Sequence, residues 1–422
     1  MTLNTRDYND VRSRLLKREE IALLDVREEA PHATGHPLFA ANVPLVRLEL
    51  DAWSKLPRRD VPIVTFDNGE GLAEQAAERL LALGYTDVAV FRDGLSGWKA
   101  AGGEVFIDVN VPSKAFGELM EAACHTPSFS ATEVKAMQDA GKDMVVVDVR
   151  RFDEYRTMSI PGGISVPGAE VVLRVPGLAP NPDTQIIVNC AGRTRSLIGT
   201  QSLINAGLPN PVAALRNGTI GWLLARQQLE HDQSRHFGAT PEPAVTLARQ
   251  RARAVADRAG VRRADKTALA NWLLQQDGRT SYCFDVRSFE EYERGHVPGS
   301  FPIPGGQLVQ ETEMYAPVRG ARIVLVDDDG ARANMTASWL AQMAWEVYVL
   351  DGLEAADFSQ SGYPAAYRKA RETRPPVERY QRPYEGTNAP ATAMQAYLDW
   401  EFGLIEQLRR DGTHHFQPLK PA

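Results

Sequence analysis

The stretch VVVDVRRFDEY at residues 145–155 decides the fold, because near copies of it occur twice more in the chain. The copies are LLDVREE at residues 23–29 and YCFDVRSFEEY at residues 282–292. In each copy an apolar run ends in Asp-Val-Arg, and a short apolar run of this kind is typical of a buried strand. Similar segments that recur at a domain-sized spacing indicate repeated domains. The sequence therefore predicts three copies of one unit.

A second apolar run follows each copy at a constant distance. The runs are PIVTFD, IIVNC and IVLVD, and they end at Asp67, Cys190 and Asp327. Each end lies 42 residues after the aspartate of its Asp-Val-Arg triplet. A loop, a helical pattern and another strand come next, and a glycine-containing turn such as Gly218–Trp222 closes the unit. Strands that alternate with helices predict the α/β class, with parallel sheets flanked by helices.

The spacing divides the chain into three tandem units and a tail. We place the units at residues 5–108, 128–232 and 265–368, and a C-terminal extension at residues 369–422. A length of 422 residues agrees with this division, since about 150 residues per domain is typical. In the tail, apolar residues at helical spacing predict an amphipathic helix that packs across a domain or subunit boundary, and a homodimer is one arrangement that would bury it. These residues are Met394, Tyr397, Leu398, Phe402, Ile405 and Leu408.

The segment that joins the second and third units, residues 233–264, has a helical pattern rich in arginine. One interpretation is a solvated linker helix. The other is a rim of positive charge that attracts anions to a neighbouring site. The sequence leaves both open.

Composition limits the function classes. Apolar residues make up 43% and charged residues 24% of the chain, and the net charge is -7, so we expect no nucleic-acid and no membrane partner. The N-terminus has no secretory pattern, and no apolar stretch approaches the roughly 18 residues that span a bilayer. Three cysteines do not form a disulfide framework and fit a reducing compartment. We therefore expect a cytoplasmic protein.

The chemistry is predicted at the cysteine that ends the second run of the middle unit. A loop between a strand and a helix can point backbone N–H groups inward as a nest for an anion, and the helix N-terminus adds about half a positive charge. Two arginines add full charges. We expect the cysteine pKa to fall from about 8.5 to roughly 6–7, which gives a nucleophilic thiolate. The candidate nucleophile is Cys190, and the candidate substrate-binding residues are Ala191, Gly192, Arg193, Thr194, Arg195 and Ser196.

The matching positions of the other two units carry carboxylates, Asp67 and Asp327. We expect both units to be catalytically inactive, either as scaffolds for the middle unit or as binding modules for a partner or another ligand. Cys283 lies inside a strand and is expected in the core. Cys124 lies in a linker without basic neighbours, and a role as a second sulfur-relay cysteine is the lesser alternative. No set of cysteines and histidines has zinc-like spacing, and we expect neither a metal ion nor another cofactor.

Taken together, these motifs resemble the rhodanese superfamily over nearly the whole chain. The likeness rests on the Asp-Val-Arg strand, on the sequence Gly295-His296-Val297-Pro298-Gly299, on the loop at residues 190–195 and on the closing Gly218–Trp222 turn. The resemblance implies a persulfide mechanism. The Cys190 thiolate would take the outer sulfur of a small anionic donor, typically thiosulfate, and pass it to cyanide or a thiol. Arg193 and Arg195 would hold the donor.

Two alternatives remain at this point. Phosphatases related to this fold use a loop one residue longer, with an arginine six positions after the cysteine, whereas Ser196 stands there in this chain and Arg195 comes one position earlier. A non-catalytic binding or regulatory protein with a vestigial loop is the alternative from another class. The short, basic loop favours sulfur transfer over both.

Overall fold

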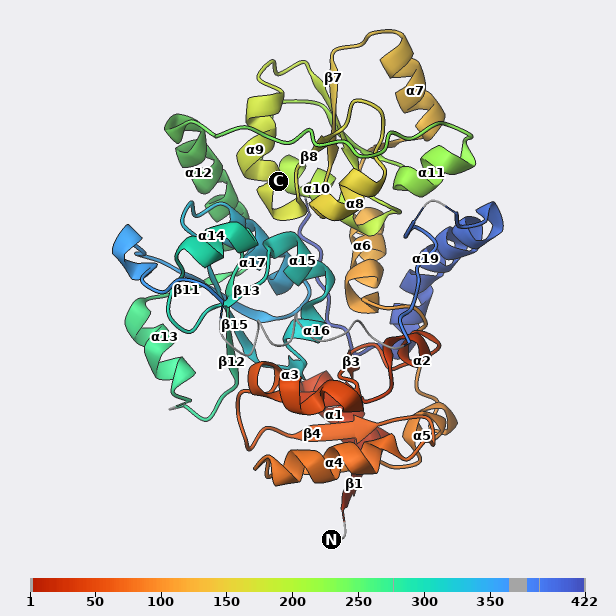
Figure 1. Cartoon of the computed structure of the whole chain (residues 1–422), viewed down its shortest axis with the longest axis vertical. Helices are drawn as coiled ribbons and strands as arrows, with labels where there is room; N and C mark the ends of the chain where they lie inside the picture. Colours follow the sequence, from red (N-terminus) through yellow and green to blue (C-terminus); the bar gives the residue numbers. More distant parts are fainter. Residues whose placement is uncertain (1–2, 276, 364–377, 387, 421–422) are drawn as a thin grey trace.

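Three separate β-sheets define the architecture (Figure 1). A computed structural model describes residues 3–275, 277–363, 378–386 and 388–420. Each predicted repeat forms one mainly parallel sheet flanked by helices, which confirms the α/β class and the three tandem units. The first sheet contains, in spatial order, β1 (Asn4–Arg6), β5 (Val88–Phe91), β4 (Ile63–Phe66) and β2 (Ile21–Asp25), and β3 (Ala41–Asn42) also pairs with β2.

The second and third sheets repeat this order with one short strand on each side. The second contains β6 (Ser128–Phe129), β10 (Val212–Leu215), β9 (Gln185–Asn189), β7 (Met144–Asp148) and β8 (Ile164–Ser165). The third contains β11 (Arg262–Ala264), β16 (Glu346–Leu350), β15 (Arg322–Val326), β12 (Ser281–Asp285) and β13 (Phe301–Pro302). Residues 364–368, where we end the third unit, and residue 369, where the extension begins, lie outside the described residues.

Helices connect the strands in each unit. The first unit has α1 (Tyr8–Lys17), α2 (Glu29–Ala33), α3 (Leu48–Lys55), α4 (Leu72–Ala82) and α5 (Gly94–Ala100). The second has α7 (Ala131–Asp139), α8 (Phe152–Thr157), α9 (Val171–Leu178), α10 (Thr194–Asn205) and α11 (Gly218–Leu224). The third has α13 (Lys266–Leu273), α14 (Phe289–Arg294), α15 (Gly305–Gln310), α16 (Thr312–Tyr315) and α17 (Arg332–Gln342). In the part of the chain that is described, no helix is both long and apolar enough to cross a bilayer.

The Asp-Val-Arg triplet ends the first strand of each repeat with a buried ion pair. The guanidinium nitrogen Nη2 lies 2.5 Å from the aspartate in the first unit and 2.7 Å from it in the other two. The same nitrogen donates to a backbone carbonyl eight residues further along the chain. Because a bidentate pair has one fixed geometry, it fastens the strand end to the following loop. The triplet therefore has the same structural role in all three units.

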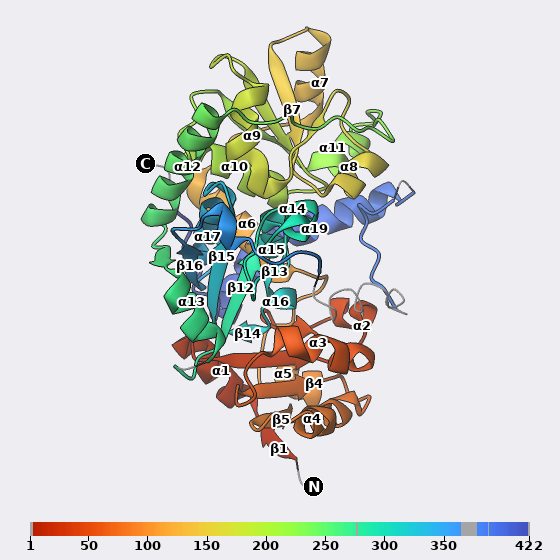
Figure 2. The ribbon, with the colours of Figure 1, turned by 60° about the vertical axis from the view of Figure 1, so that its left-hand side comes forward.

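Two further helices join the units. Helix α6 (Val111–Cys124) is almost entirely buried and lies at the centre of the molecule (Figure 1). Helix α12 (Glu242–Arg258) packs on α9 of the second unit and α17 of the third through its alanines, and Figure 2 shows α12 beside α17. The fully solvated interpretation of this linker is therefore wrong. Two of its arginines bond to the third unit: Arg249 Nε donates to the carbonyl of Asp329 at 2.7 Å, and Arg253 pairs with Asp351 at 2.9 Å.

The predicted amphipathic helix of the tail is present as α19 (Ala391–Asp411). Its buried face packs on α6 and α11 of the same chain, so it crosses a boundary between domains, and this face does not require a second subunit. The expected apolar face is correct except at Phe402, which is 52% exposed, while Leu404 is buried instead. Phe402 still has a partner, because the Arg193 guanidinium stacks over its ring at 4.2 Å.

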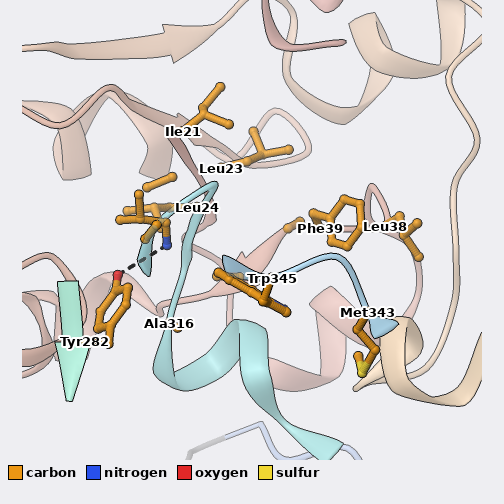
Figure 3. Packing of buried hydrophobic residues seen from close by; sticks show 14 of the residues in the cluster. Ile21, Leu23, Leu24, Leu38, Phe39, Tyr282, Ala316, Met343 and Trp345 are labelled. Carbon is orange, nitrogen blue, oxygen red and sulfur yellow. Dashed lines mark hydrogen bonds between the residues drawn. The ribbon is translucent and has the colours of Figure 1, made fainter. Parts of the chain in front are cut away.

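The first and third units share a sheet edge that the repeat pattern does not reveal. Strand β14 (Val318–Arg319) of the third unit pairs antiparallel with β2 of the first. Figure 3 shows residues of the apolar cluster around this junction, which contains Ile21 and Leu24 of the first unit and Tyr282 and Trp345 of the third. The backbone N–H of Val318 donates to the Tyr282 hydroxyl at 3.3 Å. The two units are thus one packed body around a common core.

Candidate active site

Cys190 follows the last residue of β9 and begins the loop that leads into α10. Its side chain is 1% exposed, and its thiol donates to the Ser196 hydroxyl across 3.3 Å. The N-terminal residues of α11 hold the outer side of the loop, since Thr219 N–H donates to the Cys190 carbonyl at 2.9 Å and Ile220 N–H donates to the Ala191 carbonyl at 3.0 Å. With these carbonyl groups bonded on the α11 side, the loop is fixed around the sulfur.

This fixation requires a glycine at position 218. Gly218 has a φ of +55°, and a Cβ placed there would lie 2.3 Å from the Cys190 carbonyl oxygen. No side chain fits at that distance. The glycine of the closing turn, which the sequence marks as part of the repeat, therefore lets α11 approach the cysteine loop.

The corresponding loops of the other two units show which side-chain atoms the loop amides bind. In the first unit, one carboxylate oxygen of Asp67 accepts N–H groups from Leu72 at 2.6 Å and Ala73 at 3.1 Å. In the third unit, Asp327 accepts the N–H groups of Gly330 at 3.0 Å and Ala333 at 2.8 Å. The loop amides of both units thus converge on a carboxyl group that the protein itself supplies, although burial and the nearby Asp329 raise the pKa of Asp327.

The amide six positions further along is the common donor of all three loops. It belongs to Ala73 and Ala333 in the two aspartate loops. In the cysteine loop it belongs to Ser196, whose N–H and hydroxyl both act to lower the Cys190 pKa. The cysteine therefore occupies the position that the two aspartates occupy in the other loops.

The predicted ionisation of this cysteine at neutral pH is wrong for the structure as it stands. Burial raises the pKa of the Cys190 thiol, and the nearby Arg195 and the Ser196 hydrogen bonds do not offset this effect. Removing a thiolate from water is unfavourable, and the sequence pattern gives no measure of burial. Burial therefore favours the protonated thiol over the thiolate.

Both loop arginines are already paired with carboxylates. Arg193 donates to Glu118 at 2.7 Å and also contacts Glu121, and both of these residues belong to α6. Arg195 forms two bonds to Glu154 of α8, at 2.7 and 2.8 Å. Arg195 remains close enough to the sulfur to lower its pKa, whereas Arg193 anchors the loop to α6. The sequence placed both arginines near the cysteine but could not show these acidic partners.

The space above Cys190 is a small cavity of about 20 Å³. This is close to the smallest volume that holds one water molecule. The loop from Ala191 to Arg195 forms its floor. Its remaining walls come from outside the second unit: Ser113 and Lys114 of α6, Gln310 of α15, and Tyr384, Tyr397 and Glu401 of the C-terminal extension.

A much larger cavity of about 770 Å³ lies between the three units. It shares Arg195, Gln310 and Tyr384 with the small one. Arg150, Arg151 and Arg382 also line it. The large cavity thus leads from the inter-unit space to the edge of the cysteine pocket.

A family profile described as "Rhodanese-like domain" matches residues 8–101, 130–225 and 269–352, which together make up more than half of the chain. The chain belongs to the rhodanese family. The three matched segments lie in the three units of the structure, so this rhodanese carries the domain three times, as the sequence repeats predict.

The chain is similar to a solved structure over nearly its whole length. The thiosulfate sulfurtransferase from Pseudomonas aeruginosa is 52% identical, with 99% of this chain and 100% of that chain covered and a TM-score of 0.95. The Alr3790 protein from Anabaena sp. is 30% identical over 26% of this chain and 86% of that chain, with a TM-score of 0.24. A search of curated proteins gave no match. The family and the whole-chain likeness identify a rhodanese-type sulfurtransferase.

The other two cysteines of this rhodanese lie apart from the pocket. Cys283 is buried in β12, and burial raises its pKa, as expected for a core position. Cys124 is the last residue of α6 and half-buried, with its sulfur 3.4 Å from the Leu419 carbonyl, and burial raises its pKa too. Neither lines the cavity that contains Cys190.

Proposed function

We propose that this rhodanese moves a sulfane sulfur from thiosulfate or a similar anionic donor to cyanide or a thiol through a persulfide on Cys190. The observation that carries the proposal is the shared anion position of the three loops. Where the first and third units place a fixed carboxylate against inward N–H groups, the middle unit places a thiol. A persulfide anion at Cys190 would meet the amide of Ser196, which corresponds to the amides that bond to Asp67 and Asp327.

The whole-chain relative supports the choice of donor. The Pseudomonas aeruginosa protein is a thiosulfate sulfurtransferase, and it matches all three units and the extension. The loop is also one residue shorter than the phosphatase loop, because Ser196 stands where a phosphatase would carry its arginine. We therefore favour sulfur transfer over the phosphatase alternative.

The assay separates the three cysteines. Cys190→Ser is expected to abolish thiocyanate formation from thiosulfate and cyanide, because serine oxygen does not form the persulfide. Cys124→Ser and Cys283→Ser are matched controls that remove a thiol elsewhere and should retain activity. Full activity in Cys190→Ser would overturn the proposal, and phosphate release from an aryl phosphate by the wild type would point to the phosphatase alternative.

The first and third units are inactive scaffolds in this proposal, since carboxylates fill their loops. The third unit also contributes Gln310 to the wall of the cysteine pocket. We also propose that the protein works in the cytoplasm. The three cysteines are free, which fits a reducing compartment.

A further inference from the structure

Glu401 of α19 places a carboxylate over the cysteine loop. Its side chain is 1% exposed. Oε1 accepts the Tyr397 hydroxyl at 3.0 Å and lies 3.5 Å from the Thr194 hydroxyl. Among the described residues, no group donates to Oε2. This second oxygen lies 3.3 Å from the point where a Cβ on Gly192 would stand, so it faces the loop that holds Cys190.

The charged groups around Glu401 come from three elements. Lys114 and Glu118 face it from α6, Arg193 and Cys190 face it from the loop, and Tyr397 lies one turn away on α19. Both cations have closer partners: Lys114 Nζ lies 2.6 Å from Asp108, and Arg193 pairs with Glu118. Burial raises the pKa of Glu401 to about 8, although Lys114 and Arg193 act against this. At neutral pH most of this carboxyl is therefore protonated, and the carboxylate that can take a proton becomes the main form above a pH of about 8.

The thiol of the pocket has a proton to lose, because Cys190 must become a thiolate before it attacks a donor. Its raised pKa means that water at neutral pH removes this proton poorly. Among the described residues that line the small cavity, Glu401 is the one carboxylate. A buried acceptor oxygen without a donor is unfavourable, and a proton on it would remove that cost.

Resting on the persulfide function proposed above, we propose that Glu401 is a catalytic proton acceptor. It takes the Cys190 proton when sulfur is loaded, holds it as a carboxylic acid facing the persulfide, and returns it when sulfur leaves.

The proton and the electrons balance over the cycle. In loading, Glu401 takes the thiol proton, and the Cys190 electron pair forms a bond to the outer sulfur of thiosulfate. The sulfur–sulfur bond of the donor breaks, and its electron pair leaves with sulfite. In discharge, cyanide bonds to the outer sulfur, and the persulfide bond breaks toward Cys190. The Glu401 proton then returns to the cysteine sulfur, and thiocyanate is released.

The test measures the loading step alone, as sulfite released from thiosulfate in a single turnover without an acceptor. Glu401→Gln keeps the shape and removes the base, and loading near neutral pH should slow by about 100-fold, which is typical of a lost general base. In the wild type, the loading rate should rise with pH and level off above the Glu401 pKa of about 8. In the variant, this midpoint should move to higher pH. Glu406→Gln, at an exposed position on the same helix, is the matched control and should retain the wild-type profile.

Two outcomes overturn different claims. A Glu401→Gln enzyme with the wild-type loading rate and midpoint would contradict the role of Glu401, while Cys190→Ser could still be inactive. Loading in Cys190→Ser would contradict the persulfide function itself.

A second measurement needs no substitution at Glu401 and covers the case that Glu401→Gln does not fold. Infrared difference spectra of the wild type at pH about 9, above the Glu401 pKa of about 8, should gain a carboxylic-acid carbonyl band when thiosulfate is added. The Glu406→Gln protein should gain the same band. A spectrum without this gain would overturn the proposal.

Discussion

Asp67, Cys190 and Asp327 occupy one position in three copies of the same loop. Each side chain meets the amide six residues further along, and in the aspartate loops that amide bonds to a carboxylate oxygen. The repeat therefore directs backbone amides at this one position whether or not chemistry takes place there. The sequence showed which copy carries the thiol, because the three runs end at equal spacing. It did not show the burial, and so the direction of the Cys190 pKa was wrong.

At this scale, Asp67→Ala should destabilise the first unit. The change leaves the N–H groups of Gly69, Leu72 and Ala73 without the carboxylate that they share. An unsatisfied buried donor costs about 1–3 kcal/mol, so we expect a loss of at least that size in urea unfolding, with sulfur transfer retained. Glu78→Ala, at an exposed position on α4, is the control. Equal stability of the two variants would show that the carboxylate does not hold the loop.

At the scale of elements, α19 changes the character of the site. The helix was predicted from its apolar spacing, and its place over Cys190 was not, because docking depends on which surface is complementary in the folded chain. Tyr397 is 7% exposed and packs edge-on against Tyr384 at 5.3 Å between ring centres. The two rings and Glu401 line the pocket, and we expect them to limit the access of a reagent to the thiol.

Tyr397→Ala should therefore expose Cys190. Truncating a large buried aromatic side chain costs about 3–5 kcal/mol of stability. Every 1.4 kcal/mol by which the packing of α19 over the pocket is weakened raises the population of the open state roughly tenfold. We expect iodoacetamide to alkylate Cys190 at least about tenfold faster in the variant, read by peptide mass spectrometry. Gln395→Ala, at an exposed position on the same helix, should react like the wild type. An unchanged rate in Tyr397→Ala would mean that α19 does not limit access.

At the scale of the whole molecule, the repeats are joined more closely than a string of domains. The three parallel sheets flanked by helices could be predicted from the repeated Asp-Val-Arg runs and the helices between them, whereas the order of strands in each sheet was not predicted. The pairing of β14 with β2 could not, because two residues at a sheet edge are joined by backbone hydrogen bonds, which leave no side-chain pattern. The same holds for the central place of α6, which the sequence presents only as a linker.

A substitution at Gly320 tests the junction between β14 and β2. Gly320 has a φ of +86°, and a Cβ there would lie 2.8 Å from the Arg18 carbonyl of the first unit. Gly320→Ala should push β14 from β2 and speed hydrogen exchange in Ile21–Asp25, with a stability loss above the roughly 1 kcal/mol typical of strained glycine replacements. Gly352→Ala is matched in backbone, with a φ of +73° and no atom within 4 Å of the added Cβ. Equal exchange in the two variants would contradict the coupling.

The most direct test of a persulfide on Cys190 is the mass of its peptide after the purified protein is treated with thiosulfate and then digested without reductant. The peptide that contains Cys190 should gain about 32 Da, one sulfur atom, and lose it when cyanide is added. The peptides of Cys124 and Cys283 should keep their masses. An unchanged Cys190 peptide in a protein that still forms thiocyanate, or a stable gain on another cysteine, would contradict the assignment of this residue as the sulfur carrier.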